Sequence, residues 1–386
     1  MVRIGIIGVG NMGTTHSKQI FAGRVPGLEL TALCDINPEK KEWAFQQFGD
    51  KVKFFDNTED FFANKELFDS IVIAIPHYPH PELVIRGLNE GLHVMCEKPI
   101  GVYTKNVREM NEIAKKSDKV FGIMYNQRTN PVNQKLRELV QNGELGELKR
   151  MVWIITSWYR PQSYHDSSSW RSTWKGEGGG VLLNQDPHQL DLWQWIVGMP
   201  ERIRGFASFG KHYNIEVDDD VTAYAEYENG MTATFITTTG ESPGTNRLEI
   251  SGTRGKVVLE DNKIKFSRNT IDEREFNRTW EKGFGRPEVW ECEIPTGSNR
   301  GEQHIDIFKN FVSAIENGTP LLAPGIEGIN GLTISNAIHL SAWTDDWANL
   351  PIDEDLFYNM LQEKIKNSTF KKPETTAKTL DVGGTH

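Results

Sequence analysis

The chain has 386 residues, of which 38% are hydrophobic and 25% are charged, the composition of an ordinary globular protein. This length exceeds what one hydrophobic core usually supports, so we expect two domains. The formal net charge of −10 at pH 7 argues against nucleic acid and against an anionic membrane as partners, because both attract basic surfaces.

The cysteines and the apolar runs indicate a reducing compartment. Cys34, Cys96 and Cys292 are too widely spaced for a disulfide framework or a zinc pattern, so we expect free thiols and no metal. No apolar run approaches the roughly 20 residues that cross a bilayer. The first predicted strand starts near Val2, which leaves no room for a signal peptide. We therefore predict a cytoplasmic protein without a membrane partner.

The opening of the chain contains a glycine-rich turn, Gly8-x-Gly10-x-x-Gly13, between a short apolar run and a stretch compatible with a helix. Gly8 allows a tight turn, Gly10 lets the backbone approach a pyrophosphate, and Gly13 lets the helix pack close to the strand. Free N–H groups and a partial positive charge at the start of the helix attract phosphates. The order of strand, turn and helix predicts a dinucleotide site, in which we include Asn11 and Met12.

An acidic residue closes the second apolar run. Asp35 follows Leu28–Cys34, at the tip of the next predicted strand. Its carboxylate would accept hydrogen bonds from the adenosine ribose hydroxyls and would face the 2′-phosphate of NADP. We therefore predict NAD as the cofactor and NADP as the less favoured one, although Lys40 and Lys41 lie nearby in the sequence.

Residues 1–126 alternate between strand-like and helical stretches. The predicted strands are Ile4–Val9, Leu28–Cys34, Val52–Phe55, Ser70–Ile75, His93–Cys96 and Val120–Met124. The predicted helices are Thr14–Phe21, Lys40–Phe48, Pro81–Glu90 and Asn106–Lys116. Short apolar strands separated by helices indicate right-handed βαβ units and a parallel sheet covered on both faces. We predict a Rossmann dinucleotide-binding domain.

Two further loops follow the carboxyl ends of predicted strands, where ligands bind in such a sheet. One spans 76–81, and we take Pro76, His77 and His80 as cofactor-binding residues. The other contains Glu97 and Lys98, which we count with the same site. From the strand end, Lys98 would project toward the nicotinamide, where its ammonium can donate to a substrate oxygen and stabilise developing negative charge. A solvated loop lysine is the alternative interpretation.

Residues 127–370 have a different pattern and form the predicted second domain. Helices are expected at 133–142, 181–197, 303–316 and 329–347, and strands at 148–156 and repeatedly through 202–266. The dipeptide Asn229–Gly230 between two alternating runs predicts a hairpin. Consecutive strands flanked by helices predict an α+β fold built on a large, mostly antiparallel sheet. Residues 371–386 are polar and threonine-rich, and we expect them to be disordered.

A histidine lies in a polar cluster within the helix expected at 181–197. On one helix, Asn184 and His188 are four residues apart and His188 and Asp191 are three apart, so each pair would share a face. A histidine held by a carboxylate is suited to act as a general base, because its pKa lies near neutrality. The alternative is a histidine whose hydrogen bonds are satisfied in the core. Pro187 can shift this geometry, and the role of Asp186 stays open.

The stretch 157–175 is rich in aromatic and polar side chains, namely Trp158, Tyr159, Tyr164, His165, Trp170, Arg171 and Trp174. Such a composition suits a sugar ring, because its C–H faces stack on indole while its hydroxyls hydrogen-bond outward. Tryptophans buried in a core or an interface would give the same composition. Because this loop runs directly into the histidine helix, we predict that it binds the substrate through Trp158, Tyr159, Trp170, Arg171 and Trp174.

In their order and spacing, these motifs resemble the Gfo/Idh/MocA oxidoreductase family from Val2 to about Pro351. The resemblance is carried by the glycine turn with His16, Asp35, Pro76 with His80, Gly91 before Glu97–Lys98–Pro99, Asn126-x-Arg128-x-x-Pro131, and Gly178–Gly180 leading to His188 and Asp191. It implies a Rossmann domain followed by an α/β domain. The open sheet of the second domain is then expected to form the contact between subunits of a homo-dimer or homo-tetramer.

The resemblance also implies the roles of individual residues. Lys98 and His188 would be the catalytic pair beside the nicotinamide, and Arg128 would belong to the substrate site. Many members carry an aspartate at the position of Asn184, in a D-x-G-x-H pattern. An amide cannot hold or accept a proton as a carboxylate does, so we expect Asn184 to orient the substrate or His188.

The resemblance and the residues together lead us to expect an NAD(H)-dependent dehydrogenase. It would reversibly oxidise a secondary hydroxyl of a sugar, cyclitol or glycoside to a ketone. One alternative is a glycosidase that uses tightly held NAD for transient oxidation and elimination. Another is a regulator that binds NAD(H) without catalysis, against which the presence of Lys98 and His188 argues.

Overall fold

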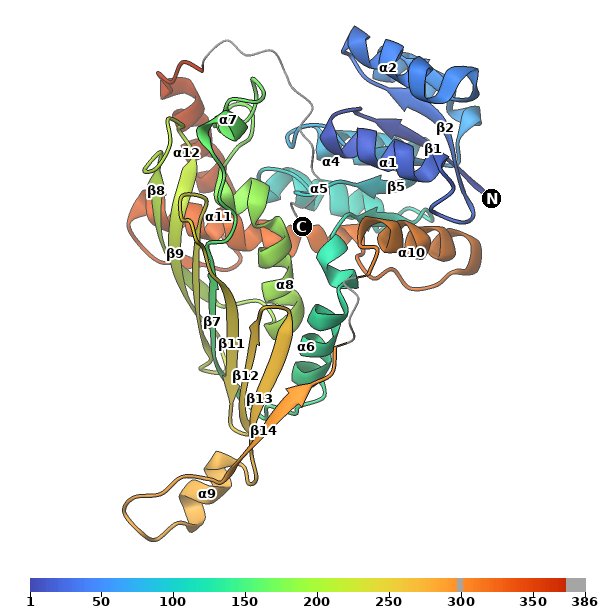
Figure 1. Ribbon diagram of the computed structural model, residues 1–386. Coiled ribbons are helices and arrows are strands. Elements are labelled where there is room, and N and C mark those ends of the chain that lie inside the picture. The colour runs from blue at the N-terminus through green and yellow to red at the C-terminus, as the bar shows by residue number, and fades with distance from the viewer. Residues whose placement is uncertain (297–300, 373–386) are drawn as a thin grey trace.

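The computed structural model describes residues 1–296 and 301–372, which contain a six-stranded and a nine-stranded sheet (Figure 1). The tail predicted to be disordered over 371–386 lies outside the described residues from residue 373 onward. Among the described residues, no helix combines the length and the apolar character that a membrane crossing requires.

Six parallel strands form the first sheet, in the order β3-β2-β1-β4-β5-β6. The strands are β1 (Val2–Ile7), β2 (Leu28–Cys34), β3 (Lys53–Phe55), β4 (Ser70–Ile73), β5 (His93–Cys96) and β6 (Phe121–Ile123). The helices are α1 (Asn11–Phe21), α2 (Pro38–Phe48), α3 (Thr58–Ala63), α4 (His80–Asn89) and α5 (Thr104–Ala114). Short 3₁₀ turns are η1 (Gly49–Lys51), η2 (Lys65–Leu67) and η3 (Asn126–Thr129). The predicted Rossmann architecture is confirmed.

The order of the strands determines where a ligand can bind. Strands β1 and β4 are almost wholly buried, as expected for parallel strands that helices cover on both faces. The strand order reverses between β1 and β4, and their carboxyl ends therefore flank the crevice of the sheet. The loops that follow β1, β4 and β5 meet at this edge.

Nine strands form the second sheet, in the order β14-β13-β12-β11-β7-β10-β9-β8-β15. They are β7 (Leu148–Ile155), β8 (Arg202–Phe209), β9 (Asp218–Glu226), β10 (Thr232–Thr238), β11 (Asn246–Gly252), β12 (Gly255–Glu260), β13 (Lys263–Asn269), β14 (Val289–Ile294) and β15 (Ala348–Asn349). Neighbouring strands are antiparallel except β7 and β10, which are parallel. The mostly antiparallel sheet that the sequence predicts is confirmed.

Helices cover one face of this large sheet (Figure 1). The helical segments of the second half are α6 (Pro131–Gln141), α7 (Gln162–His165), η4 (Val181–Gln185), α8 (Pro187–Val197), α9 (Glu273–Thr279), α10 (His304–Asn317), η5 (Gly325–Glu327), α11 (Gly328–Thr344) and α12 (Glu354–Asn367). Along β9, Val221 and Ala223 are buried whereas Thr222 and Tyr224 are exposed. The alternation shows that the opposite face of the sheet is open to solvent.

Helix α10 does not lie on the large sheet but returns to the Rossmann domain (Figure 1). The ring of Phe308 on α10 meets the ring of His16 on α1 edge-on, with centroids 5.1 Å apart. The segment that follows α10 also joins the first sheet, because Ile123 N donates to Ala323 O at 3.1 Å. Residues from the later part of the chain thus complete the packing of the cofactor domain.

The helix predicted over 181–197 is wrong in one respect: it is two helical segments. Residues Val181–Gln185 form a π-helical turn, and α8 begins at Pro187. Proline has no N–H to donate to the preceding turn, which explains the break at this point. Asn184 and His188 therefore lie on different segments, and the face-sharing expected from α-helical spacing does not apply.

Candidate active site

The glycine turn has the geometry of a phosphate cradle. Gly8 has φ +95°, and a Cβ on Gly13 would lie 1.9 Å from Gly8 O, so neither position tolerates a side chain. A Cβ on Gly10, by contrast, would meet no atom within 4 Å. Helix α1 begins directly after Gly10, which has no side chain to cap it, and a helix start of this kind is suited to bind a phosphate. Asn11 and Met12 form the first turn of this helix.

The carboxylate of Asp35 is fixed next to the glycine turn. Its Oδ2 accepts a hydrogen bond from Val9 N at 2.6 Å, and its Oδ1 accepts one from Asn37 N at 2.8 Å. Two main-chain donors therefore orient the carboxylate at the end of β2, beside the turn at the end of β1. This is the position at which an acidic residue binds a ribose.

Glu97 and Lys98 lie at the end of β5 and point into different surroundings. The buried Glu97 carboxylate accepts a hydrogen bond from His16 Nε2 at 2.7 Å. Although burial acts in the opposite direction, His16 lowers the pKa of Glu97 to about 2. The ammonium of Lys98 donates to the main-chain oxygen of Asn184 at 2.9 Å. Burial, together with the positive charge of Arg171, lowers the pKa of Lys98.

The contact from Lys98 crosses between the two domains. Asn184 belongs to the π-helical turn of the second domain, and His188 is the second residue of the helix that follows. His188 is buried, and its ring centroid lies 6.2 Å from that of Tyr125 at the end of the first domain. Lys98 of the first domain therefore contacts the segment of the second domain that leads to His188.

Asp191, the carboxylate neighbour that the sequence suggests for His188, forms a buried ion pair with Arg128. Its Oδ1 lies 2.6 Å from Arg128 Nη2, and its Oδ2 lies 2.8 Å from Arg128 Nε. Arg128 also pairs with Glu327, and both Arg128 and Asp191 are almost wholly buried. Although burial opposes it, the Asp191 carboxylate raises the pKa of Arg128. Arg128 was predicted to contact substrate, and the structure instead commits its guanidinium to an internal ion pair.

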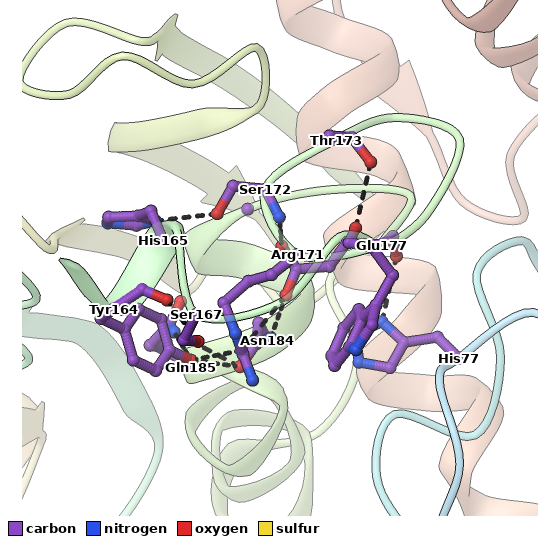
Figure 2. Close-up of polar contacts among 12 residues, drawn as sticks. His77, Tyr164, His165, Ser167, Arg171, Ser172, Thr173, Glu177, Asn184 and Gln185 are labelled. Atoms are coloured by element: carbon purple, nitrogen blue, oxygen red, sulfur yellow. Dashed lines mark hydrogen bonds and ion pairs between the residues drawn. The ribbon is translucent and has the colours of Figure 1, made fainter. Parts of the chain in front are cut away.

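Part of the aromatic loop surrounds Asn184. Tyr164 donates its hydroxyl proton to Asn184 Oδ1 at 3.2 Å, and Arg171 Nη1 donates to the Tyr164 oxygen at 2.6 Å. Gln185 Nε2 also donates to this phenolic oxygen, at 2.9 Å (Figure 2). The half-buried Trp170 meets the ring of His77 with centroids 5.5 Å apart. Two predicted substrate residues, Trp170 and Arg171, therefore lie with Asn184 at the domain interface.

The other predicted aromatic contacts lie elsewhere. Trp174 is buried and packs with its ring against Phe209, His339 and Trp343, so this residue belongs to the core of the second domain. Tyr159 is exposed, and the half-buried Trp158 lies under the guanidinium of Arg160. Trp174 is thus one of the core tryptophans that the composition allowed as an alternative.

The residues of the loop after β4 differ in what they contact. His80 is fully buried, with its ring nitrogens 2.7 Å from Pro99 O and 2.9 Å from Ile75 O. Its imidazole joins two loops of the cofactor domain instead of reaching a ligand, contrary to the prediction. Pro76 is exposed, and His77 contacts Glu177 O through Nδ1 at 3.0 Å. His77 therefore links the cofactor domain to the aromatic loop.

Sequence reasoning missed Glu177, which lies at the centre of these contacts (Figure 2). Its carboxylate is almost wholly buried and accepts hydrogen bonds from Ser172 N at 2.5 Å and from the side-chain amide of Asn184. Arg171 Nη1 lies 3.7 Å from the same carboxylate. The available signal was its place directly before the glycine triplet Gly178–Gly180, two residues beyond the stretch 157–175 that was assigned to the substrate.

Asp186 is a second buried acid that the sequence left without a role. Its side chain is fully buried in the break between η4 and α8, near Thr237 of β10. Burial raises the pKa of Asp186 well above its ordinary value. Burial therefore disfavours the ionised form of this carboxyl group, which lies near the ammonium of Lys98.

Two family models match the chain, each over its own range of residues. Residues 2–125 match the model of an oxidoreductase family with an NAD-binding Rossmann fold, and residues 133–258 match the GFO/IDH/MocA C-terminal domain. Levoglucosan dehydrogenase of Pseudarthrobacter phenanthrenivorans is 26% identical, over 91% of this chain and 98% of the relative. Inositol 2-dehydrogenase of Rhizobium meliloti is 24% identical, over 87% of this chain and 95% of the relative.

Solved structures share the fold over almost the whole chain. The WlbA dehydrogenase of Bordetella pertussis, solved in complex with NADH and UDP-GlcNAcA, superposes with a TM-score of 0.76. It is 24% identical, and the superposition covers 91% of this chain and 99% of the WlbA chain. Both sheets and their connection are therefore common to the two proteins.

Proposed function

Because the chain belongs to the GFO/IDH/MocA family of NAD-binding oxidoreductases, we propose that it reversibly oxidises a secondary hydroxyl of a sugar, cyclitol or glycoside to a ketone. Relatives named levoglucosan dehydrogenase and inositol 2-dehydrogenase align over most of both chains and support this substrate class. One observation carries the proposal. The ammonium of Lys98 in the cofactor domain lies 2.9 Å from Asn184 O, on the segment that leads to His188.

In the proposed reaction, His188 accepts the proton of the substrate hydroxyl while Lys98 donates a hydrogen bond to the same oxygen. Negative charge builds up on that oxygen as the proton leaves, and the ammonium stabilises it. The lowered pKa of Lys98 makes its ammonium a stronger hydrogen-bond donor. Holding Lys98 of the cofactor domain against the segment that leads to His188 supplies much of the rate, because the reacting groups are already positioned.

The residues of the cofactor domain fit NAD. The open space at Gly10 and the uncapped start of α1 suit a pyrophosphate, and Asp35 suits a ribose. We propose that the turn 8–13 and Asp35 hold the adenosine end, with Pro76, His77, Glu97 and Lys98 toward the nicotinamide. When bound, NAD supplies the ring that takes up hydride from the substrate carbon.

A panel of sugars, cyclitols and glycosides, followed by NADH absorbance, tests the proposed function. We expect at least one member of the panel to reduce NAD in proportion to ketone formed. Release of free sugar from a glycoside without net NADH would instead identify the NAD-dependent glycosidase. NADH binding without turnover of any substrate would indicate the regulator.

Replacing Asp35 with serine is expected to change the cofactor preference. The variant loses charge-assisted hydrogen bonds to the ribose, which contribute about 1.5–3 kcal/mol, so NAD affinity should fall by roughly 10- to 100-fold. NADP affinity should rise because the carboxylate no longer repels the 2′-phosphate. Fluorescence titrations with NADH and NADPH measure both constants. Asp56→Ser, at an exposed carboxylate that pairs with Lys41, is the matched control.

We further propose a homo-dimer or homo-tetramer in the cytoplasm, with residues 1–126 for the cofactor and 127–370 for substrate and self-association. The open face of the nine-stranded sheet supports self-association, since it exposes Phe206 and Tyr224. The arm around α9 and β14 extends from the same sheet and exposes Trp290 (Figure 1). The free thiols of Cys34 and Cys96 are consistent with a reducing compartment. Light scattering over a range of protein concentrations measures the mass of the particle in solution and so tests the proposed homo-dimer or homo-tetramer.

A further inference from the structure

The carboxylate of Glu177 contacts Asn184, on the segment that leads to His188 and that Lys98 contacts. Figure 2 shows it between the backbone of Ser172 and the side chain of Asn184, with Arg171 alongside. Its two oxygens accept from Ser172 N and from the Asn184 amide, and Arg171 Nη1 is 3.7 Å away. Both the carboxylate and the guanidinium are buried, so solvent screens these interactions only weakly.

Asn184 connects Glu177 to the ammonium of Lys98, because it contacts both residues. The side-chain amide of Asn184 donates to Glu177, and its side-chain oxygen accepts from Tyr164. With both ends of the side chain held, the main-chain oxygen of the same residue is fixed where it accepts from Lys98 Nζ at 2.9 Å. The orientation of the lysine therefore depends on a carboxylate seven positions before Asn184 in the sequence.

Glu177 also controls the loop that approaches the cofactor domain. Ser172 has φ +60°, a left-handed conformation that costs energy for a residue other than glycine. The hydrogen bond from Ser172 N to Glu177, and the contact between Ser172 Oγ and His165 Nδ1 at 2.8 Å, stabilise it. The main-chain oxygen of Glu177 contacts His77 of the Rossmann domain. One residue thus connects the loop, the turn and the first domain.

We propose that Glu177 is a positioning residue for the reaction: by holding Asn184 it aims the ammonium of Lys98 at the substrate oxygen, and it adds a buried negative charge to that of Glu97. The role rests on the proposed function. Burial raises the pKa of Glu177 and Arg171 opposes that rise, which agrees with a carboxylate that depends on its partners. Asn184 alone cannot provide the charge, because an amide does not ionise.

The test exchanges the carboxylate at position 177 and the amide at position 184. Glu177→Gln turns an NH₂ group toward one of two donors, Ser172 N or Asn184 Nδ2, and Asn184→Asp places two carboxylates in contact. In the double variant E177Q/N184D, the new amide can donate to the new carboxylate at position 184 while its oxygen accepts from Ser172 N. The side chain at position 184 can still accept from Tyr164. The double variant restores the hydrogen-bond pattern with the charge moved from position 177 to position 184.

We expect each single variant to lower kcat by about tenfold or more while NADH binding changes little, because a displaced catalytic group costs rate. The kcat of the double variant should be about tenfold higher than the value obtained by multiplying the two single losses, because residues in contact have coupled effects. Glu216→Gln is the matched control. It removes the charge of a carboxylate that accepts from Trp174 N on the aromatic loop, its amide oxygen can still accept this hydrogen bond, and kcat should stay unchanged.

Several outcomes would overturn the role of Glu177. These are full activity of either folded single variant, losses that multiply in the double variant, or coupling that is present in unfolding free energy but absent from kcat. If the wild-type protein oxidises no member of the panel, the proposed function fails instead. In that case the coupling between positions 177 and 184 in the free energy of unfolding, measured with urea, still tests their hydrogen bond. The positioning role is then rejected, because the reaction that it serves does not occur.

Discussion

Lys98→Ala is expected to reduce kcat by about 10²–10⁴-fold, the range that a positioned proton donor or acceptor contributes. The ammonium of Lys98, in the cofactor domain, donates to Asn184 O. Without the ammonium, the substrate oxygen loses its proposed hydrogen-bond donor. Stopped-flow and steady-state measurements of NADH formation determine whether the loss falls on the chemical step. Fluorescence titration should give nearly the same affinity for NADH, because the glycine turn and Asp35 are unchanged.

Lys105→Ala serves as the control for this experiment. Lys105 is an exposed lysine of the same domain, paired with Asp355, and its removal should change neither activity nor stability appreciably. A Lys98 variant with wild-type kcat would remove the residue from the mechanism. Loss of NADH binding together with kcat would assign Lys98 to the cofactor site alone.

Asp191→Ala is expected to destabilise the fold by about 3–5 kcal/mol, because removing one partner of a buried ion pair leaves the other charge uncompensated. Arg128 makes two hydrogen bonds to Asp191, and both side chains are 1% exposed. Urea unfolding followed by circular dichroism measures the change, which is read from the midpoint if the slope stays constant.

Two further variants distinguish the effect of the buried Arg128–Asp191 pair from that of Glu327. Glu327 also contacts Arg128, but its side chain is 38% exposed, so Glu327→Ala should cost at most about 1 kcal/mol. Arg128→Met combined with Asp191→Leu should be more stable than Asp191→Ala, because the charge that loses its partner is then Glu327, which is partly exposed and reaches water, and no buried charge remains unpaired. Equal losses for Asp191→Ala and Glu327→Ala would contradict the assignment of Asp191 as the principal partner.

The sheet of the first domain could be predicted because its apolar runs end at clear turn signals. The structure reproduces the strands Leu28–Cys34 and His93–Cys96 at the predicted residues. The short helix α3 and the final helix α12 were missed because their apolar faces are weak. Their caps were readable, since Asn57 and Asp353 accept hydrogen bonds from the first turns of these helices.

The candidate site was predictable where function requires a local motif and unpredictable where it depends on tertiary contacts. The glycine turn, Asp35 and Lys98 lie within a few residues of a strand end, so their neighbours follow from the chain itself. The partner of Arg128 is 63 positions away, and neither spacing nor composition indicates it. Pro187 was recognised as a disturbance, but the π-helical turn before it follows from packing against β9, not from a periodic pattern.

The return of α10 to the first domain affects how this protein can be divided. Its apolar side chains, including Phe308 and Phe311, are buried, and the amino group of Met1 pairs with Glu316 on the same helix. A fragment severed after residue 126 would lose this cover and expose the apolar surface beneath it. Transplanting the nucleotide-binding half into another dehydrogenase would require two separate pieces of chain. Substitutions in α10 therefore affect the packing of the cofactor domain, although the helix follows the strands of the second sheet in the sequence.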